Sequence, residues 1–450
     1  MKAIHVQRRV AFFCPSSSIF TKNYAVTIPE LYSLFLLHPS VETDTRKLKK
    51  GDLFFALKGP SFNGNTFALK ALEAGAAYAV IDEPIAPNNG RLILVDDVLT
   101  TLQQLARHHR EQFNIPFIAI TGSNGKTTTK ELVHAVLASH YTTCTTQGNL
   151  NNHIGIPLTL LRVQKDAQFA VIEMGANHQK EIEGYCTYVQ PTHGIITNAG
   201  KAHLEGFGGE AGVRKGKGEL FDYLRAHNGV AFAFNDYDYL HEMSAGIPTI
   251  EWYGTTSGTV TGEVAHSEPF LVLKMTSGVN FKALSTQLVG SYNLPNVLCA
   301  VAVGKHFNVP EDKMVAALSQ YTPSNSRSQL VNAGSNKIIL DAYNANPSSM
   351  KAAIENFAKV EAAQKILLLG AMMELGPESI AEHQQLVDLI ARYNWHAVAL
   401  VGGDFAKVSH PYHYFQNAAA AAEWLKAQNF TDSYLLVKGS RSIGMEKVIQ

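Results

Sequence analysis

Residues 115–129 constrain the fold of this chain more than any other segment. An apolar, β-branched run ends in a turn that contains Gly122 and Gly125, and an amphipathic helix starts at Lys126. In this order, glycines let backbone N–H groups approach phosphate oxygens, and the helix N-terminus adds partial positive charge. We therefore expect an α/β domain that binds ATP or GTP, with Lys126 at the β- and γ-phosphates and the hydroxyl of Thr127 at Mg²⁺.

This loop departs from the standard P-loop pattern at one position, because Ile120 stands where that pattern has glycine. The alternative is an ordinary glycine turn followed by a threonine that caps a helix. The position of the loop between a buried strand and a helix favours nucleotide binding. The residues interpreted as nucleotide-contacting are Gly122, Ser123, Asn124, Gly125, Lys126, Thr127 and Thr128.

The bulk properties exclude several classes of protein. The 450 residues are enough for about three domains. The 38 basic residues balance 38 acidic ones, so no broad basic surface for nucleic acid is expected. No apolar run reaches the roughly 18 residues that a membrane span needs. The cysteines, Cys14, Cys144, Cys186 and Cys299, lack metal or redox spacing and indicate reduced, mostly buried thiols of a cytosolic protein.

Alternating strand and helix patterns divide the chain. Residues 1–26 contain an apolar stretch too short for a signal peptide, and we interpret them as a disordered leader or a misassigned translation start. Three α/β domains are expected, at 27–112, 113–322 and 323–450, with a polar linker at 321–326. Expected strands lie at 51–57, 77–81, 92–95, 169–173, 194–198, 337–340, 365–369, 397–401 and 434–437.

Polar residues after buried strands form the candidate site. Glu173 ends one strand, where an acidic residue usually meets the Mg²⁺ of a P-loop nucleotide, although capping of the next helix is the alternative. His203 lies in a glycine-rich loop and could ligate a second metal, although a loop histidine is more often a surface residue. Lys217 lies between glycines and, by itself, indicates a solvated helix start.

Amides and a further carboxylate complete the candidates. The loop 147–157 is rich in asparagine, which suits turns and also the binding of a polar substrate. Asn293 and Asn296 are one helical turn apart and could read a purine edge, or Asn293 could cap the helix. Asp341 follows a strand of the last domain and begins a segment with a phenol and two amides.

These motifs resemble those of the Mur ligases of peptidoglycan synthesis, and closely the MurF type, from about Thr27 to the C-terminus. The family's shortened T-G-x-N-G-K-T loop accounts for Ile120. Its segments E-M-G-A-N, A-H-L-E-G-F-G, D-x-Y-N-A-N-P and K-G-S-R match residues 173–177, 202–208, 341–347 and 438–441. The resemblance implies a small N-terminal UDP-binding α/β domain, a central P-loop ATPase-like α/β domain and a C-terminal Rossmann-like α/β domain.

The resemblance also implies catalytic and metal-binding roles. Lys126 and Thr127 would hold the ATP phosphates and a first Mg²⁺. Glu173 and His203 would ligate a second Mg²⁺. Lys217 would be the lysine that the family carbamylates with CO₂, a modification that the residues alone do not reveal.

Substrate contacts follow from the same resemblance. Those to ATP would come from Asn293 and Asn296 at adenine, Arg327 at the γ-phosphate, Asp341 near the ribose, and Tyr343 and Asn344 over the nucleotide. Those to the UDP-muramoyl substrate would come from Thr45, Arg46 and Asn63 in the first domain and Thr146, Asn149 and Asn152 in the second. The departures from the family pattern are Asn63, Asn65, Tyr292 and Ala371, which replace Asp, His, His and Asp.

The implied reaction is ATP-dependent joining of D-alanyl-D-alanine to the terminal carboxylate of UDP-N-acetylmuramoyl-tripeptide through an acyl phosphate, by a monomeric cytoplasmic enzyme. Domain closure would bring Asp341 and Tyr343 over the site and exclude water. Three alternatives remain: a sister ligase that adds one amino acid, a P-loop kinase or regulatory NTPase, and a non-catalytic nucleotide-binding scaffold. The segment 343–347 argues against the first, and the filled catalytic positions argue against the third.

Overall fold

The structure is a computed structural model that describes residues 26–86, 90–324 and 326–450. It divides into two compact units, one that ends at His109 and one from Arg110 to Gln450. Residues 1–25 of the expected leader, with Cys14, lie outside the described residues, as does Asn325 of the expected linker.

The first unit is a small α/β domain. Its main sheet has four parallel strands in the order β1-β2-β5-β6, and β3 and β4 form a separate antiparallel pair. Alternate residues of β2 and β5, including Phe54, Ala79 and Ile81, pack against Ala68 and Leu72 of α2 and close a small core. The elements are α1 (Ile28–Leu37), β1 (Val41–Glu42), β2 (Leu53–Phe55), β3 (Lys58–Gly59), β4 (Phe62–Asn63), a 3₁₀ turn (Gly64–Phe67), α2 (Ala68–Glu73), β5 (Tyr78–Ile81), β6 (Leu92–Leu94) and α3 (Val98–Arg110).

The second unit begins with a nine-stranded sheet in the order β15-β14-β13-β12-β11-β10-β7-β9-β8. Neighbouring strands from β8 to β13 are parallel, and β14 and β15 add an antiparallel end. The strands are β7 (Phe117–Thr121), β8 (Thr143–Thr145), β9 (Phe169–Glu173), β10 (His193–Ile196), β11 (Val230–Phe234), β12 (Thr249–Gly254), β13 (Val260–His266), β14 (Val272–Ser277) and β15 (Ala283–Ser285).

Helices cover both faces of this sheet, as two neighbouring residues of β10 show. Gly194 lies so close to α8 that an added Cβ would be 2.7 Å from Leu224. The ring of His193 faces α10, with its centroid 5.6 Å from that of His306. Successive residues of a strand point to opposite faces, so α8 and α10 lie on opposite sides. The helices are α4 (Lys126–Ala138), α5 (Gly155–Leu160), α6 (Glu181–Val189), α7 (Leu204–Phe207), α8 (Glu210–Ala226), α9 (Asp238–Ser244), α10 (Leu294–His306) and α11 (Glu311–Gln320).

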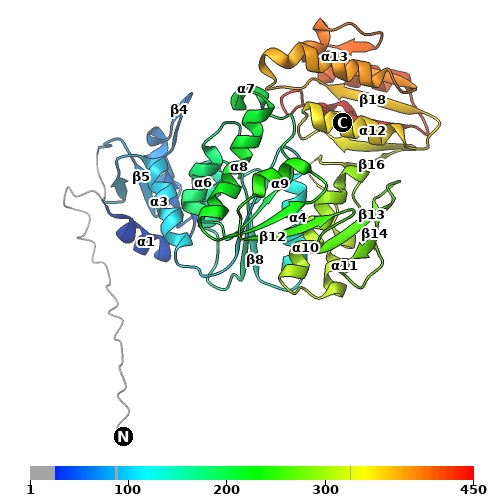
Figure 1. The fold of residues 1–450 in the computed structure, drawn as a ribbon. Helices are drawn as coiled ribbons and strands as arrows, with labels where there is room; N and C mark the ends of the chain where they lie inside the picture. The colour runs from blue at the N-terminus through cyan, green and yellow to red at the C-terminus, as the bar shows by residue number, and fades with distance from the viewer. Residues whose placement is uncertain (1–25, 87–89, 325) are drawn as a thin grey trace. The chain divides into compact units, whose positions relative to one another are not determined.

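A six-stranded sheet in the order β16-β17-β21-β18-β19-β20 forms the C-terminal domain (Figure 1, yellow to red). Among the described residues of this sheet, only the edge pair β16–β17 is antiparallel. Alternate residues such as Leu340, Leu368 and Val437 share one core with Ala421 of α14. The elements are β16 (Gln329–Ala333), β17 (Asn336–Asp341), α12 (Pro347–Ala358), β18 (Lys365–Gly370), α13 (Ser379–Ile390), β19 (Ala397–Val401), β20 (His413–Phe415), α14 (Ala418–Gln428) and β21 (Tyr434–Lys438).

The expected strands are confirmed to within a few residues. The strand expected at 194–198 ends two residues earlier, at Ile196, because Thr197 and Asn198 turn to bond the phosphate loop. The antiparallel end formed by β14 and β15 is a feature that the strand–helix alternation did not predict. Within the described ranges, no helix is both long and apolar enough to cross a bilayer.

Candidate active site

The loop between β7 and α4 has the backbone that its glycines were expected to provide. Gly122 has a φ of 144°, and an added Cβ would be 2.0 Å from the Oγ1 of Thr197. Gly125 has a φ of 78°, and an added Cβ would be 2.7 Å from the Oδ1 of Asn296. Both the positive φ and the lack of space require glycine at these positions.

The first turn of α4 is arranged to receive an anion. Its N-cap residue, Gly125, offers no side-chain cap, so the initial N–H groups of the helix remain available to a ligand. Lys126 folds back, and its Nζ donates to the carbonyl of Gly122 across 2.6 Å and to that of Ser123 across 3.2 Å. Burial lowers the pKa of Lys126 to about 8, partly opposed by the nearby carboxylate of Glu173.

Glu173 at the end of β9 faces the same turn. Its Oε1 accepts hydrogen bonds from the hydroxyl of Thr127 across 3.1 Å and from the amide of Asn151 across 2.7 Å. Its Oε2 is buried and has no hydrogen-bond partner among the described residues. A buried carboxylate oxygen without a partner is costly. Glu173 therefore does not act as a helix cap, and Oε2 is available to a cation.

The loop after β10 stabilises the phosphate loop through several hydrogen bonds. The hydroxyl of Thr197 donates to the carbonyl of Asn124 across 2.6 Å, and the side chain of Asn198 contacts both the N–H and the carbonyl of Asn124. The hydroxyl of Ser123 donates to the carbonyl of Gly200 across 2.7 Å. The backbone of the phosphate loop is thus held in place independently of any ligand.

Lys217 is fully buried, so the sequence interpretation of a solvated helix start is wrong. Its Nζ donates to the carbonyl of Ala176 across 2.9 Å and lies 4.8 Å from the centre of the Phe207 ring. Burial, with the nearby positive charge of Lys126, lowers the pKa of Lys217 well below its ordinary value. The surroundings of Lys217 therefore favour its neutral, nucleophilic amine.

Asn293 and Asn296 form one chain of hydrogen bonds. The amide of Asn296 donates to the Oδ1 of Asn293 across 2.9 Å, and its own Oδ1 accepts from the hydroxyl of Thr129 across 3.1 Å. The amide of Asn293 donates backwards to the carbonyl of Val289 across 2.9 Å, and its side chain makes no capping bond to α10. The capping alternative for Asn293 is therefore wrong.

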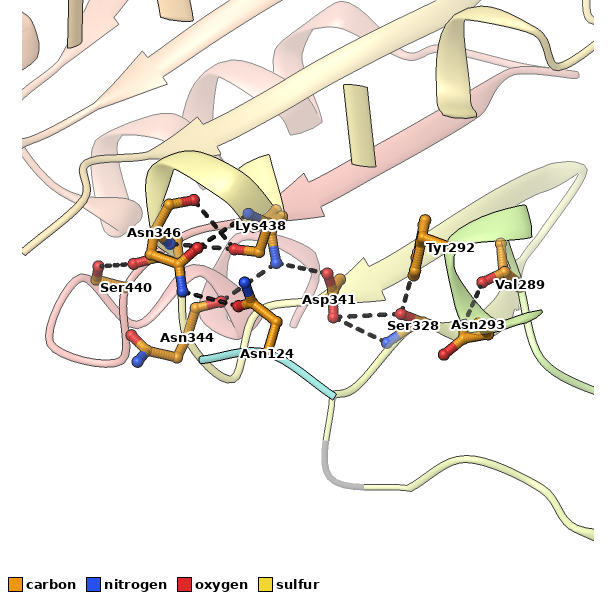
Figure 2. Close-up of polar contacts among 12 residues, drawn as sticks. Asn124, Val289, Tyr292, Asn293, Ser328, Asp341, Asn344, Asn346, Lys438 and Ser440 are labelled. Carbon is orange, nitrogen blue, oxygen red and sulfur yellow. Dashed lines mark hydrogen bonds and ion pairs between the residues drawn. The ribbon is translucent and has the colours of Figure 1, made fainter. Parts of the chain in front are cut away.

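Figure 2 shows a second chain of contacts, which joins the central and C-terminal domains. The hydroxyls of Tyr292 and Ser328 are 2.9 Å apart, and the N–H of Ser328 donates to the Oδ1 of Asp341 across 3.0 Å. The other oxygen of Asp341 forms an ion pair of 2.5 Å with the buried Lys438. Lys438 also donates to the carbonyl of Asn344 across 3.2 Å.

Three further contacts arrange residues of the C-terminal domain, and one of them reaches the phosphate loop. The guanidinium of Arg327 stacks on the ring of Tyr343, 3.6 Å from its centre. The amide of Asn346 donates to the Oδ1 of Asn124 across 2.7 Å (Figure 2). Asn346 is also the N-cap of α12, since its side chain accepts from the N–H of Ser349.

The loop that carries His203 is held by the C-terminal domain. The Nδ1 of His203 is 2.5 Å from the Oε2 of Glu374, and its side chain is 19% exposed. Lys201 forms an ion pair of 2.5 Å with Glu382, and its N–H donates to the hydroxyl of Ser348 across 3.1 Å. His203 is therefore not the surface histidine that the alternative interpretation described.

Most of these elements contribute residues to one pocket with a volume of about 730 Å³. Its lining includes the first turn of α4, Glu173, His203 and Asn296 from the central domain and Asp341 from the C-terminal domain. Such a pocket at the carboxyl ends of parallel strands is the usual ligand site of an α/β sheet.

Family models match most of the chain. The Mur ligase middle domain matches residues 120–304, the domain described as Mur ligase, glutamate ligase domain matches 326–441, and the domain described as Mur ligase family, catalytic domain matches 39–110. A UDP-N-acetylmuramoyl-tripeptide–D-alanyl-D-alanine ligase of Bacillus subtilis is 33% identical over 93% of this chain and 94% of its own length. This chain belongs to the Mur ligase family. The resemblance drawn from its motifs, including the MurF type, is confirmed.

Two further comparisons agree with this placement of the Mur ligase. The ligase of the same name from Escherichia coli is 34% identical over 94% of this chain and 95% of its own length. A crystal structure of MurF from Acinetobacter baumannii superposes with a TM-score of 0.83 at 32% identity, covering 91% of this chain and 92% of that one. The expected three-domain α/β architecture is confirmed by these matches.

Most of the residues assigned to ATP and metal by the resemblance line the pocket of this Mur ligase. Asp341 and Tyr343, which were expected to arrive by domain closure, already belong to the lining. Gly122 and Lys217 are not among the lining residues, but Gly122 accepts from Lys126 and Lys217 donates to the carbonyl of Ala176, which are. The lining residues that were predicted are Ser123, Asn124, Gly125, Lys126, Thr127, Thr128, Glu173, His203, Asn293, Asn296, Arg327, Asp341, Tyr343 and Asn344.

Of the three predicted substrate contacts in the second unit, one lines the pocket and two do not. Asn152 lines the pocket, and its Oδ1 accepts from the N–H groups of Ile154 and Gly155 at the start of α5. Thr146 is fully buried and accepts from the N–H of Glu173 instead of lining the pocket. Asn149 lies in the same loop, outside the lining.

Two of the three predicted substrate contacts in the first unit, Arg46 and Asn63, already interact with neighbouring residues. Arg46, next to Thr45, chelates Asp44 with bonds of 2.9 and 2.8 Å, and these bonds lower the pKa of Asp44 to about 2. Asn63 donates to Glu83 and accepts from Asn65. An amide at position 63 therefore suits a neighbouring carboxylate that an aspartate would repel.

Sequence reasoning missed several residues that build the site. Asn151 bonds Glu173, and Glu374 bonds His203. Lys438 forms an ion pair with Asp341, and Ser328 links Asp341 to Tyr292 through hydrogen bonds. The available signals were the strand-end position of Lys438 in the K-G-S-R segment and the asparagine run around Asn151. The contact of Glu374 with His203 had no local signal, because the two residues are 171 positions apart.

Proposed function

We propose that this Mur ligase joins D-alanyl-D-alanine to the terminal carboxylate of UDP-N-acetylmuramoyl-tripeptide in peptidoglycan precursor synthesis. The observation that carries the proposal is the pocket in which the phosphate loop meets the Asp341–Asn346 segment of the C-terminal domain. The names of the relatives from Bacillus subtilis and Escherichia coli supply the substrate pair. MurF ligases use ATP, and the open first turn of α4 suits its phosphates.

The proposed reaction has two steps. An oxygen of the tripeptide carboxylate attacks the γ-phosphorus of ATP, the bond from that phosphorus to the bridging oxygen breaks, and an acyl phosphate and ADP form. The free amine of D-alanyl-D-alanine then attacks the acyl carbon, loses a proton, and expels inorganic phosphate. Carboxylate and triphosphate repel each other, so the first step needs positive charge around the transferred group.

The residues of the pocket supply that charge and its orientation. Lys126 would turn from the carbonyl of Gly122 to the β- and γ-phosphates, whose negative charge favours its ammonium form. Arg327, stacked on Tyr343, would face the γ-phosphate. Asp341 would accept from the ribose, with Lys438 holding its orientation. Asn293 and Asn296 would contact adenine, with Asn344 nearby.

The residues present fit Mg²⁺. Glu173 offers a buried oxygen without a partner, next to the hydroxyl of Thr127. In the described part of the chain, no group of three or more His, Cys, Asp or Glu side chains is arranged around a metal position. Mg²⁺ is usually bound by one or two carboxylates together with substrate phosphates, so this sparse set is adequate. When bound, Mg²⁺ would neutralise phosphate charge; we assign one ion to Thr127 and a second to Glu173 and His203.

We also propose that Lys217 carries a carbamate. Its neutral amine would attack CO₂, form a nitrogen–carbon bond and release a proton, which leaves a carbamate anion. Full burial and the lowered pKa of Lys217 favour this neutral amine. The test is activity in CO₂-free buffer: added bicarbonate should restore it in the unaltered enzyme and have no effect on Lys217→Ala. An intact activity without bicarbonate and an unmodified mass would contradict the carbamate.

The domain limits of 27–112, 113–322 and 323–450 are part of the proposal, with Thr45, Arg46 and Asn63 assigned to the uridine diphosphate group. Asn149 and Asn152 are assigned to the muramoyl-peptide, whereas the fully buried Thr146, outside the pocket lining, is no longer assigned to it. We further propose that the enzyme works as a monomer in the cytoplasm, where its nucleotide substrates are made. A single species of 49.1 kDa by light scattering would support the monomer.

The experiment that tests the function measures phosphate release with Mg-ATP and UDP-N-acetylmuramoyl-tripeptide, with and without D-alanyl-D-alanine. Release that requires both acceptor and dipeptide supports the ligase. Release with a free amino acid in place of the dipeptide would indicate a sister ligase. Release or phosphate transfer that is indifferent to any amine would indicate a kinase or NTPase.

A further inference from the structure

Lys130 is a fully buried lysine that the proposed reaction does not use. It follows Lys126 by one turn of α4 and has no exposed surface. Its Nζ donates to the carbonyl of Thr146 across 2.6 Å and is 2.7 Å from the Oε1 of Glu131. Lysine is almost never fully buried without partners, and burying its charge is costly. The pairing of Lys130 with the carbonyl of a residue 16 positions later in the chain therefore needs an explanation.

Thr146 links Lys130 to the candidate metal site. It follows β8 directly, is fully buried, and its own N–H donates to the carbonyl of Val171 in β9. Its hydroxyl accepts from the N–H of Glu173 across 3.0 Å. The position of Thr146 therefore sets the position of the Glu173 backbone.

The contacts form a closed ring. The Nζ of Lys130 in α4 donates to the carbonyl of Thr146, and the hydroxyl of Thr146 accepts from the N–H of Glu173. The Oε1 of Glu173 in turn accepts from the hydroxyl of Thr127, which also belongs to α4. Thr127 and Lys130 belong to one rigid helix and are about one turn apart. The ring therefore fixes the distance between the Thr127 hydroxyl and the Glu173 carboxylate, which are assigned to the first and the second Mg²⁺.

We propose that Lys130 is a positioning residue, which acts through Thr146 to hold Glu173 at the distance from Thr127 that binding of a magnesium nucleotide requires. The inference rests on the proposed function only for the identity of the nucleotide. Removing a group that orients a metal ligand by a hydrogen bond usually lowers metal affinity by about 10- to 100-fold. Lys130 would thus tune the affinity for the magnesium complex without contacting it.

The test is calorimetric binding of the ATP analogue AMP-PNP with Mg²⁺, compared with binding of adenosine alone, in the absence of any acceptor. Lys130→Met should raise the Kd of the magnesium complex about tenfold and leave the Kd of adenosine unchanged. Thr146→Val, which lacks the hydroxyl, should shift it in the same direction, whereas the matched Thr146→Ser should stay near the unaltered protein. Glu131→Gln is the control for the other partner of Lys130 and should change the Kd less than twofold.

The double variant Lys130→Met/Thr146→Val should bind no more weakly than the weaker single variant, because both changes break the same ring. Fully additive effects, or a Lys130→Met protein with unchanged Kd, would overturn the inference. If Lys130→Met does not fold, equal affinities of Thr146→Val and Thr146→Ser would overturn it instead. Because no acceptor is present, the expected shifts stand even if the ligase assay fails.

Discussion

The hydroxyl of Thr127 donates to the Oε1 of Glu173 across 3.1 Å, which joins the first turn of α4 to the end of β9. The second oxygen of Glu173 is buried and without a partner among the described residues. Two strand–helix units that are adjacent in the sheet thereby present one hydroxyl and one carboxylate oxygen to the pocket. We expect Thr127 and Glu173 to bind the two magnesium ions of the nucleotide site, one each.

Glu173→Gln should raise the Mg²⁺ concentration needed for half-maximal activity by about tenfold or more. The amide is the same size as the carboxylate, so the bonds to Thr127 and Asn151 can be largely kept while the charge is lost. Activity is measured against Mg²⁺ at saturating ATP. An unchanged Mg²⁺ requirement would show that Glu173 has only a structural role.

Lys126→Ala should reduce turnover by about 10³-fold. Removing one hydrogen-bond donor that stabilises charge in the transition state lowers kcat by about 10²- to 10³-fold. The fold should be kept, since the lysine bonds only to carbonyls of its own loop. Lys215→Ala, at an exposed position on α8, is the matched control. The readout is ADP release. Near-normal ADP release by Lys126→Ala would mean that the phosphate loop has been wrongly assigned.

The Lys201–Glu382 ion pair should stabilise the contact between the His203 loop and the C-terminal domain. Glu382 is buried and Lys201 is partly exposed, so we expect a coupling of about 1 kcal/mol, below that of a fully buried pair. A double-mutant cycle of Lys201→Met and Glu382→Gln, followed by urea unfolding, measures this coupling. A coupling of zero would show that the Lys201–Glu382 ion pair makes no contribution to the free energy of unfolding.

His193 should make the protein sensitive to acid. Burial, with the neighbouring charge of His306, lowers the pKa of His193 to about 4, below the value of about 6.5 expected in the unfolded chain. Between these values the unfolded state binds more protons, so stability is complete above about pH 6.5 and falls as the pH decreases towards 4. The loss between pH 7 and pH 5 should be about 2 kcal/mol.

The matched variant for this prediction is His193→Gln, which cannot titrate. Its free energy of unfolding should fall less than that of the unaltered protein over the same interval, by about the same 2 kcal/mol. Denaturant unfolding at both pH values gives the comparison. Equal losses in the two proteins would assign the acid sensitivity to other groups.

Local sequence patterns predicted the parts of the site that are built locally. The phosphate loop needs glycines and a helix start, and Glu173 ends a buried run, so both are visible in a short window. Lys217 was misinterpreted because Gly-Lys-Gly resembles a solvated turn, whereas Phe207 and Ala176 bury it from other elements. No local pattern signals a contact that only the tertiary fold creates.

The same limit explains the residues that were missed. Lys130 is helix-compatible and would be exposed on an isolated helix; only the return of the chain through β8 brings the carbonyl of Thr146 to it. Glu374 and Lys438 come from strands and turns of another domain. The antiparallel strands β14 and β15 also depend on pairing across the sheet instead of a periodic signal.

The measurement that tests the central claim most directly follows oxygen from the substrate into phosphate. UDP-N-acetylmuramoyl-tripeptide is labelled with ¹⁸O in both oxygens of its terminal carboxylate and incubated with Mg-ATP and D-alanyl-D-alanine. If an acyl phosphate forms, each released phosphate carries one ¹⁸O and the new peptide carbonyl keeps the other. Released phosphate without label, or release that does not need the dipeptide, would contradict the proposed ligase mechanism.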